Sequence, residues 1–197
     1  MSEQKQNTIR WGAMLPFLLF MGVAGLFLYK LTFSEGGQMT LKSVLIGKVV
    51  PQFHLPPVPG LLDADGKPVP GFSGETLQNN GKLTILNVWA SWCRSCRYEH
   101  KHLEELAHAT GAQIYGFNYR DSASGARAFL RQYGNPYTAI GMATGRNGID
   151  WGVHRVPETF IINEKGKIIY KYPGPIDKKV IHEMIIPGIA KAQAAGL

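Results

Sequence analysis

The sequence has very few cysteines, and the two that it has lie close together. Cys93 and Cys96 are the only cysteines in 197 residues, so the chain has no separate disulfide framework and a hydrophobic core must hold its fold. Aliphatic and aromatic residues are plentiful, which excludes an intrinsically disordered chain. The length suits one domain of ordinary size with an appendage.

Acidic residues are also scarce, with 14 Asp and Glu against 21 Lys and Arg, which gives a formal net charge of +7. The basic residues are nevertheless scattered, and no basic run is longer than Lys178–Lys179. A nucleic-acid-binding surface would cluster its basic residues and place aromatic residues among them. We therefore predict no nucleic acid among the partners. The ordinary tryptophan and methionine content gives no reason to expect a bound cofactor.

One long hydrophobic run stands near the N-terminus. From Trp11 to Leu31 the only charged residue is Lys30, and about twenty such residues can cross a membrane as a helix. A cleaved signal peptide is the alternative, but its apolar part would be unusually long and no clear cleavage site follows it. We therefore predict four parts of the chain: an N-terminal tail at 1–10, an uncleaved transmembrane anchor at 11–32, a tether at 33–49 and a folded domain at 50–197.

The folded domain is organised around residues 83–106, with the sequence LTILNVWASWCRSCRYEHKHLEEL. The first seven of these residues are mostly apolar, which is typical of a strand covered on both faces of a parallel sheet. After a turn at residues 90–91, a helical pattern begins at about Cys93. This pattern puts Cys96 and Leu103 on the helix face that meets the sheet.

The placement of the two cysteines indicates redox chemistry. The free N–H groups and the partial positive charge of a helix N-terminus stabilise a thiolate, which lowers the pKa of Cys93. Arg94 and Arg97 act in the same direction, and we expect Cys93 at an exposed helix start. Cys96 is close enough to close a small disulfide ring and should be more buried. We therefore predict that Cys93 attacks the substrate disulfide and that Cys96 resolves the mixed disulfide that forms.

The same two cysteines could instead be half of a zinc site, completed by His100 or His102. A structural zinc site normally takes its ligands from two separated segments, and this chain has no further cysteine. The strand–turn–helix context and the flanking Trp89 and Trp92 favour redox chemistry. We therefore expect no bound metal at this position.

The rest of the domain alternates between apolar strand patterns and amphipathic helix patterns, which predicts the α/β class. Two patterns have clear local signals: a possible helix cap at Asp121–Ser122 and a tight turn at residues 164–166 that predicts an antiparallel hairpin. The predicted elements are a strand at 52–55, an irregular stretch at 56–71, a strand at 112–119, a helix ending near 133, an extended or irregular segment at 137–142, a loop at 144–151, strands at 159–163 and 167–172, and a helix at 177–190 that Pro187 shortens or bends.

The segment at 87–96, NVWASWCRSC, resembles the active-site strand and turn of the thioredoxin superfamily. Three further segments, PQFHLP at 51–56, RYEH at 97–100 and GVHRVPETF at 152–160, are most similar to the membrane-anchored thiol:disulfide interchange proteins of bacterial cytochrome c biogenesis, the DsbE or CcmG type. The resemblance implies a thioredoxin-like fold, with a central mixed sheet flanked by helices, an N-terminal extension and a single N-terminal transmembrane helix.

The resemblance also implies further site residues. In the resembled fold the proline that matches Pro157 is cis and faces the cysteines, which would leave the backbone of Val156 free to pair with an extended substrate peptide. Thioredoxins keep a buried Asp on the active-site strand where this chain has Asn87, which cannot titrate. The resembled branch has acidic residues at the positions of Glu99 and Glu158. The predicted supporting residues are Trp92, Glu99, Val156, Pro157 and Glu158.

The function implied by the resemblance is the reduction of disulfides in the periplasm, with the N-terminus in the cytoplasm and the anchor in the inner membrane. The implied partners are apocytochrome c or a cytochrome-maturation thiol protein, and a transmembrane electron donor of the DsbD or CcdA kind. Arg94 and Ser95 replace the proline-containing pair common in the family, so the partner and the reduction potential stay open. A general periplasmic disulfide oxidant or isomerase and a Cys/His metal-delivery module are the alternatives.

Overall fold

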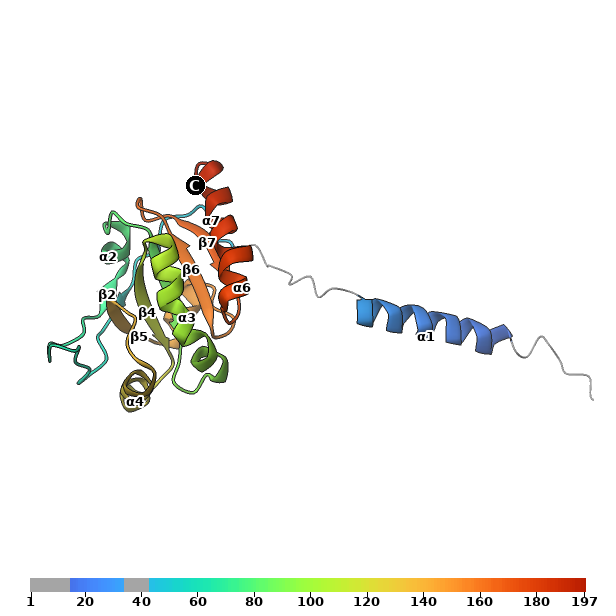
Figure 1. The fold of residues 1–197 in the computed structure, drawn as a ribbon, viewed down its shortest axis with the longest axis horizontal. Coiled ribbons are helices and arrows are strands. Elements are labelled where there is room, and N and C mark those ends of the chain that lie inside the picture. Colours follow the sequence, from blue (N-terminus) through green and yellow to red (C-terminus); the bar gives the residue numbers. More distant parts are fainter. Residues whose placement is uncertain (1–14, 34–42) are drawn as a thin grey trace, which may run out of the picture. The chain divides into compact units, whose positions relative to one another are not determined.

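The computed structural model describes residues 15–33 and 43–197, which belong to two separate units, 1–40 and 41–197 (Figure 1). The first unit contains helix α1 (Leu15–Phe33), whose large apolar side chains between Leu15 and Tyr29 are exposed. No helix in the two described ranges is both long and apolar enough to cross a membrane. The predicted tail at 1–10, and parts of the predicted anchor and tether, lie outside the described residues.

A mixed five-stranded sheet forms the centre of the second unit, with the strand order β5-β4-β3-β6-β7. The central strand β3 runs parallel to β4 and antiparallel to β6. All six residues of β3 are buried, because strands flank it on both sides and further parts of the chain pack on both faces. The prediction of a thioredoxin-like mixed sheet is confirmed. The strands are β3 (Thr84–Trp89), β4 (Gln113–Tyr119), β5 (Ala139–Ala143), β6 (Glu158–Ile162) and β7 (Ile168–Tyr172).

One face of the sheet is covered by helices from the middle and the end of the chain (Figure 1). Leu103, Phe129 and Ile185 come from three of these helices and share one buried cluster with Ile85 and Ile161 of the sheet. The helical elements on this face are α3 (Arg94–Thr110), α4 (Ala123–Tyr133), α6 (Lys178–Val180), the π-helical turn η2 (Ile181–Ile185) and α7 (Ile186–Ala194).

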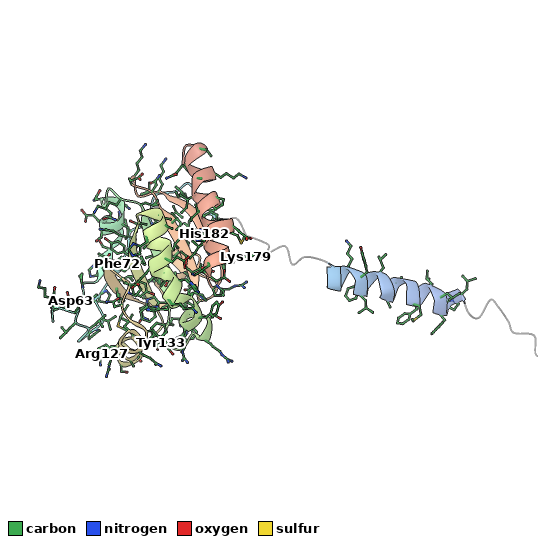
Figure 2. The ribbon with its side chains drawn as sticks, viewed as in Figure 1. Asp63, Phe72, Arg127, Tyr133, Lys179 and His182 are labelled. Carbon is green, nitrogen blue, oxygen red and sulfur yellow. A yellow bond between two sulfur atoms is a disulfide. The ribbon has the colours of Figure 1, made fainter. Side chains whose placement is uncertain are left out.

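The N-terminal extension and the segment before β6 cover the other face. Phe72, labelled in Figure 2, packs edge-on against Tyr115 of the sheet at a ring distance of 5.3 Å, and Phe53 contacts Trp151 at 5.5 Å. Residues 47–50 also hydrogen-bond to residues 166–168, so the contacts of this layer begin before residue 50. Its elements are β1 (His54–Leu55), β2 (Phe72–Ser73), α2 (Gly74–Gln78) and α5 (Gly145–Asp150).

Two sequence-based expectations on this layer and on the C-terminal helix need correction. The loop predicted at 144–151 is wrong, because Thr144 and Asn147 form a reciprocal capping box that starts the short helix α5. The C-terminal helix, predicted at 177–190, continues to Ala194, so Pro187 does not shorten it. Pro187 lies in the first turn of α7, directly after the π-helical turn, where a missing backbone N–H is tolerated.

Gly141 of β5 provides a test of the packing between the sheet and the N-terminal extension. A Cβ atom at this position would lie 2.3 Å from Cβ of Leu55, far inside van der Waals contact. We expect Gly141→Ala to lower the free energy of unfolding by about 1–3 kcal/mol, measured by urea denaturation. Gly145→Ala is the matched control, because its nearest atom, Arg120 Cδ, lies 3.9 Å away. Equal stability of the two variants would contradict this packing.

Candidate functional site

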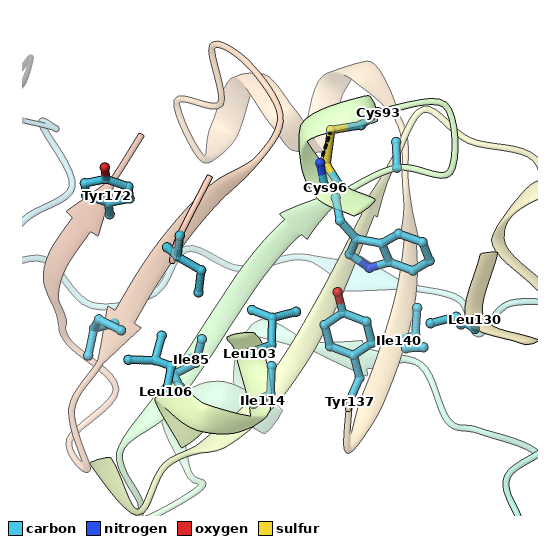
Figure 3. Packing of buried hydrophobic residues seen from close by; sticks show 14 of the residues in the cluster. Ile85, Cys93, Cys96, Leu103, Leu106, Ile114, Leu130, Tyr137, Ile140 and Tyr172 are labelled. Atoms are coloured by element: carbon cyan, nitrogen blue, oxygen red, sulfur yellow. Dashed lines mark hydrogen bonds between the residues drawn. A yellow bond between two sulfur atoms is a disulfide. The ribbon is translucent and has the colours of Figure 1, made fainter. Parts of the chain in front are cut away.

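The two cysteines form a disulfide at the start of α3, just past the end of β3 (Figure 3). Their Cα atoms are 5.3 Å apart. Cys93 is the N-cap residue of α3, and its sulfur accepts a hydrogen bond of 3.0 Å from the backbone N–H of Cys96. In the reduced protein, this N–H and the helix dipole are placed to stabilise a thiolate on Cys93, so the lowered thiol pKa stays a prediction.

The two sulfurs have unequal surroundings. Cys96 is 1% exposed and Cys93 is 5% exposed, so the prediction that Cys96 is the more buried of the pair is confirmed. The expectation of an exposed Cys93 is wrong for the oxidised protein, because its sulfur lies over the first helical turn against the N–H of Cys96. The neighbouring Trp92 is 56% exposed, so the surface next to the disulfide is accessible and partly aromatic.

The loop between β4 and α4 holds the turn that carries the dithiol. The carboxylate of Asp121 accepts hydrogen bonds from the backbone N–H and the hydroxyl of Ser91, at 2.6 and 2.7 Å. The indole N–H of Trp92 donates to the carbonyl oxygen of Arg120 at 3.1 Å, and Arg120 has a left-handed φ of 48°. The sequence identified Asp121 only as a possible helix cap. Its position after the neighbouring parallel strand was the available signal, because the ends of parallel strands meet at one sheet edge.

Glu99 lies one turn after Cys96 and is 1% exposed, so it is not a solvated helix residue. Its two carboxylate oxygens accept hydrogen bonds from the side-chain amide of Asn87 at 2.8 Å and from the backbone N–H of Ile176 at 3.0 Å. Burial raises the pKa of Glu99 to about 8, against the lowering effect of these two bonds. A buried carboxyl that titrates near neutral pH beside a dithiol can accept and return a proton.

Tyr137 is the fourth member of this buried network and was missed by sequence reasoning. Its hydroxyl donates to Oδ1 of Asn87 at 2.9 Å, and Nδ2 of Asn87 lies 3.3 Å from Oγ1 of Thr159. Burial and the nearby Glu99 raise the pKa of Tyr137 well above its usual value, so its hydroxyl keeps its proton. Tyr137 lies 50 residues from Asn87, and no local sequence pattern indicates this contact.

The peptide bond between Val156 and Pro157 is cis, as the resemblance implies. The ladder between β3 and β6 pairs Val88 with Glu158, so Pro157 lies next to the end of β3 from which the dithiol turn begins. Within the described parts of the chain, neither the N–H nor the C=O of Val156 has a hydrogen-bond partner. These two groups are therefore available to an extended peptide.

Glu158 lies on the other face of the sheet. It alternates along β6 with Thr159, which faces Asn87, and it shares its face with Phe160. Its carboxylate pairs with Nζ of Lys171 at 2.9 Å in a nearly closed environment, and it accepts the backbone N–H of His154 at 3.3 Å. The structure thus does not bring Glu158 into contact with the dithiol. Its bond to His154 instead fixes the segment that leads to Pro157.

The histidines of the alternative zinc site have other partners. Nε2 of His100 lies 3.0 Å from the carbonyl oxygen of Gly134, and Nδ1 of His102 lies 3.5 Å from the carboxylate of Glu105. Burial is the main cause that lowers the pKa of His100. Among residues 15–33 and 43–197, no three His, Cys, Asp or Glu side chains form a group that could hold a metal ion.

Known proteins are similar to this chain in sequence and in fold. Residues 47–185 match the family model described as Redoxin. The chain is 38% identical over 191 residues to the thiol:disulfide interchange protein DsbE of Allochromatium vinosum, which covers 95% of this chain and 97% of that protein. It is 35% identical over 188 residues to the thiol:disulfide interchange protein CycY of Rhizobium leguminosarum, with 91% and 94% covered. A crystal structure of a thiol:disulfide interchange protein of the thioredoxin family from Chlorobium tepidum covers 72% of this chain and 95% of that chain, with a TM-score of 0.54 at 22% identity, and supports the fold.

The raised pKa of Glu99 makes a prediction about the pH dependence of stability. Between pH 4.5 and about 8, Glu99 keeps a proton in the folded protein that it has lost in the unfolded chain. The unfolded state then binds fewer protons, so the free energy of unfolding falls as the pH rises through this window. Gln cannot titrate, so we expect Glu99→Gln to show a shallower fall, measured by urea denaturation of the oxidised protein across the window.

The slope of stability against pH, rather than the absolute stability, is the readout of this experiment. Glu164→Gln is the control, because Glu164 is exposed in the turn between β6 and β7. Its slope should equal that of the wild-type protein. Parallel curves for the wild-type protein and Glu99→Gln would show that Glu99 does not titrate in this window.

Proposed function

The chain belongs to the Redoxin family, as a thiol:disulfide oxidoreductase related to DsbE and CycY, and on this premise we propose that it reduces disulfides during cytochrome c maturation by dithiol exchange at Cys93 and Cys96. The observation that carries the proposal is the asymmetry of the disulfide. The Cys93 sulfur sits at a helix N-terminus beside an accessible surface, and the Cys96 sulfur is buried next to a titratable network. The substrates we propose are apocytochrome c at its haem-attachment cysteines or a thiol protein that acts on them.

The exchange proceeds in two steps that transfer two electrons to the partner. The Cys93 thiolate attacks one sulfur of the partner disulfide, whose S–S bond breaks as a mixed disulfide forms and a partner thiolate leaves. Cys96 then attacks the Cys93 sulfur, which re-forms the Cys93–Cys96 disulfide and releases the second partner thiolate. The protein ends oxidised and the partner reduced. A transmembrane electron donor of the DsbD or CcdA kind would return the protein to the dithiol state.

We assign Glu99 the role of accepting the proton of the Cys96 thiol. The second step requires the Cys96 thiol to lose its proton inside the core, and Asn87 cannot accept it. Glu99 lies one turn away on the same face of α3, and its pKa of about 8 matches that of a thiol more closely than an ordinary carboxyl does. Its carboxylate form keeps both oxygens hydrogen-bonded, which supports this assignment.

The surface around the dithiol supports the binding of an extended peptide. The unpaired N–H and C=O of Val156 can continue the ladder of β6 with a substrate strand, beside Pro157. The exposed indole of Trp92 offers a packing surface on the other side of Cys93. We assign Glu158 a supporting part, because its pair with Lys171 fixes the segment that carries Val156 and Pro157.

We further propose that residues 11–32 anchor the protein in the bacterial inner membrane, with 1–10 in the cytoplasm, 33–49 as a tether and 50–197 in the periplasm. The apolar run in the sequence, with Lys30 as its one charged residue, supports the anchor, and it begins four residues before the described helix α1. The apolar side chains that α1 exposes are also consistent with a lipid environment. A periplasmic domain explains why an external electron donor is needed.

The roles of the two cysteines can be separated by single substitutions in the reduced full-length protein. We expect Cys93→Ser to reduce a disulfide-bonded peptide with an apocytochrome haem-attachment sequence no faster than the uncatalysed reaction, because the attacking thiolate is gone. Cys96→Ser should form the mixed disulfide and stop there, because no thiol resolves it. Stopped-flow kinetics and mass spectrometry of the trapped species measure both results.

Ser95→Ala is the control, because it changes the same turn and keeps both thiols. Reduction by Cys93→Ser at the wild-type rate would contradict the mechanism. A broad set of proteins trapped by Cys96→Ser in cells, together with a reduction potential near about −120 mV, would instead indicate a general oxidant.

The anchor is tested by carbonate extraction of bacterial membranes and by the mass of the mature protein. We expect the full chain to stay in the membrane fraction with residues 1–32 retained. The double variant Val23→Arg and Leu26→Arg should be retained less well, because each charge near the centre of a spanning helix costs roughly 2.5–3.5 kcal/mol. A mature protein that lacks residues 1–32 would indicate a cleaved signal peptide instead.

A further inference from the structure

We propose that Tyr137 is a positioning residue of the dithiol site, because its hydroxyl holds the Asn87 amide in the orientation that donates to Glu99. The inference rests on the proposed function of Glu99 as the proton acceptor of Cys96. It assigns a role to a residue that lies outside the dithiol turn and belongs to no motif of the sequence. Tyr137 acts on the exchange only through Asn87 and Glu99.

The ring of Tyr137 is fixed on two sides. It stacks on the indole of Trp89 at 5.6 Å with an interplanar angle of 12°, and the ring of His100 meets it at 5.8 Å. The backbone N–H of Tyr137 donates to the side chain of Asn135 at 3.1 Å. Figure 3 shows the hydroxyl pointing toward the end of the cluster that holds the disulfide. Because the ring is held in this way, its hydroxyl has one position, and from there it donates to Oδ1 of Asn87.

The Asn87 amide needs a partner at each end. Its two ends have nearly the same shape, so hydrogen-bond partners alone decide which end faces Glu99. Nδ2 faces the carboxylate at 2.8 Å, and Oδ1 then requires a donor, which the Tyr137 hydroxyl supplies. Donation to Oδ1 also polarises the amide and strengthens the bond from its N–H to Glu99. Through Asn87, Tyr137 thus favours the ionised form of the Glu99 carboxyl.

Few other groups around Glu99 could stabilise its ionised form. The sheet presents uncharged Asn87 and Thr159, and β7 presents Tyr172 opposite Thr159. The turn before α6 supplies Ile176, and the adjacent Asp177 uses its carboxylate to cap α6. On this side of the sheet the titratable groups are Tyr137, Tyr170 and Tyr172, and α3 adds Cys96 and His100 beside Glu99. Glu158 of β6 and Lys171 of β7 pair with each other on the opposite face.

The test is a comparison of Tyr137→Phe with the wild-type full chain. Phenylalanine keeps the ring stacking and removes only the hydroxyl, so Asn87 loses the donor that holds it. We expect the pKa of Glu99, followed by carbon NMR of its labelled carboxyl, to rise by about 0.5–1 unit, the size of one hydrogen bond. The pH profile of disulfide reduction should shift in the same direction. Tyr133→Phe is the control, because Tyr133, labelled in Figure 2, contacts the same His100 ring from α4 and should shift neither.

Two further backgrounds show whether Tyr137 acts through Asn87. In Asn87→Ala, we expect Tyr137→Phe to cause no additional shift in the Glu99 titration. In Glu99→Gln, the pH profile of reduction should be the same with Tyr or Phe at position 137. An unchanged Glu99 titration in Tyr137→Phe, or a shift that persists in Asn87→Ala, would overturn the inference. The NMR titration needs no partner and no turnover, so it can fail while the Cys93 mechanism holds, and it can succeed while that mechanism fails.

Discussion

The structure of this site depends on one buried polar side chain, Asn87, at the centre of β3. Buried polar groups must be hydrogen-bonded, and the amide of Asn87 meets that requirement by contacting Glu99 of α3, Thr159 of β6 and Tyr137 in the segment before β5. Glu99 adds the backbone of Ile176 before α6. Five segments of the chain are thereby fixed relative to one another: β3, α3, β6 and the stretches before β5 and α6. The bonds from Asn87 and Ile176 also lower the pKa of the Glu99 carboxyl, against the larger raising effect of its burial.

A second constraint fixes the turn above this network from the neighbouring strand. Asp121, at the end of β4, accepts both the N–H and the hydroxyl of Ser91, and Trp92 bonds to Arg120. The turn that carries the cysteines is therefore fixed by the loop between β4 and α4 and by its continuation into α3. The result is two sulfurs with different surroundings, one at a helix N-terminus and one in the core. Such asymmetry is what a dithiol needs if one sulfur attacks and the other resolves.

Local sequence patterns predicted the elements that make up this frame but not the side-chain contacts between them. The apolar run of β3, the cap at Ser122 and the hairpin of β6 and β7 each depend on residues close in sequence, and each was predicted. Helix α5 was missed, because its capping box occupies a short segment rich in glycine. Tyr137 was missed for a different reason: its bond to Asn87 joins residues 50 positions apart and exists only once the fold has formed.

The two acidic residues that the resemblance implied have separate parts in the structure, and the alternation of a strand explains why. Successive residues of β6 face opposite sides, so Thr159 reaches Asn87 while Glu158 turns away and pairs with Lys171. A helix has no such alternation, and Glu99, one turn after Cys96, faces the same way as that cysteine. A carboxyl on α3 can therefore serve the buried sulfur although the strand below carries an amide. In this chain the titratable carboxyl, Glu99, lies on α3, and β3 supplies the neutral side chain of Asn87 that orients it.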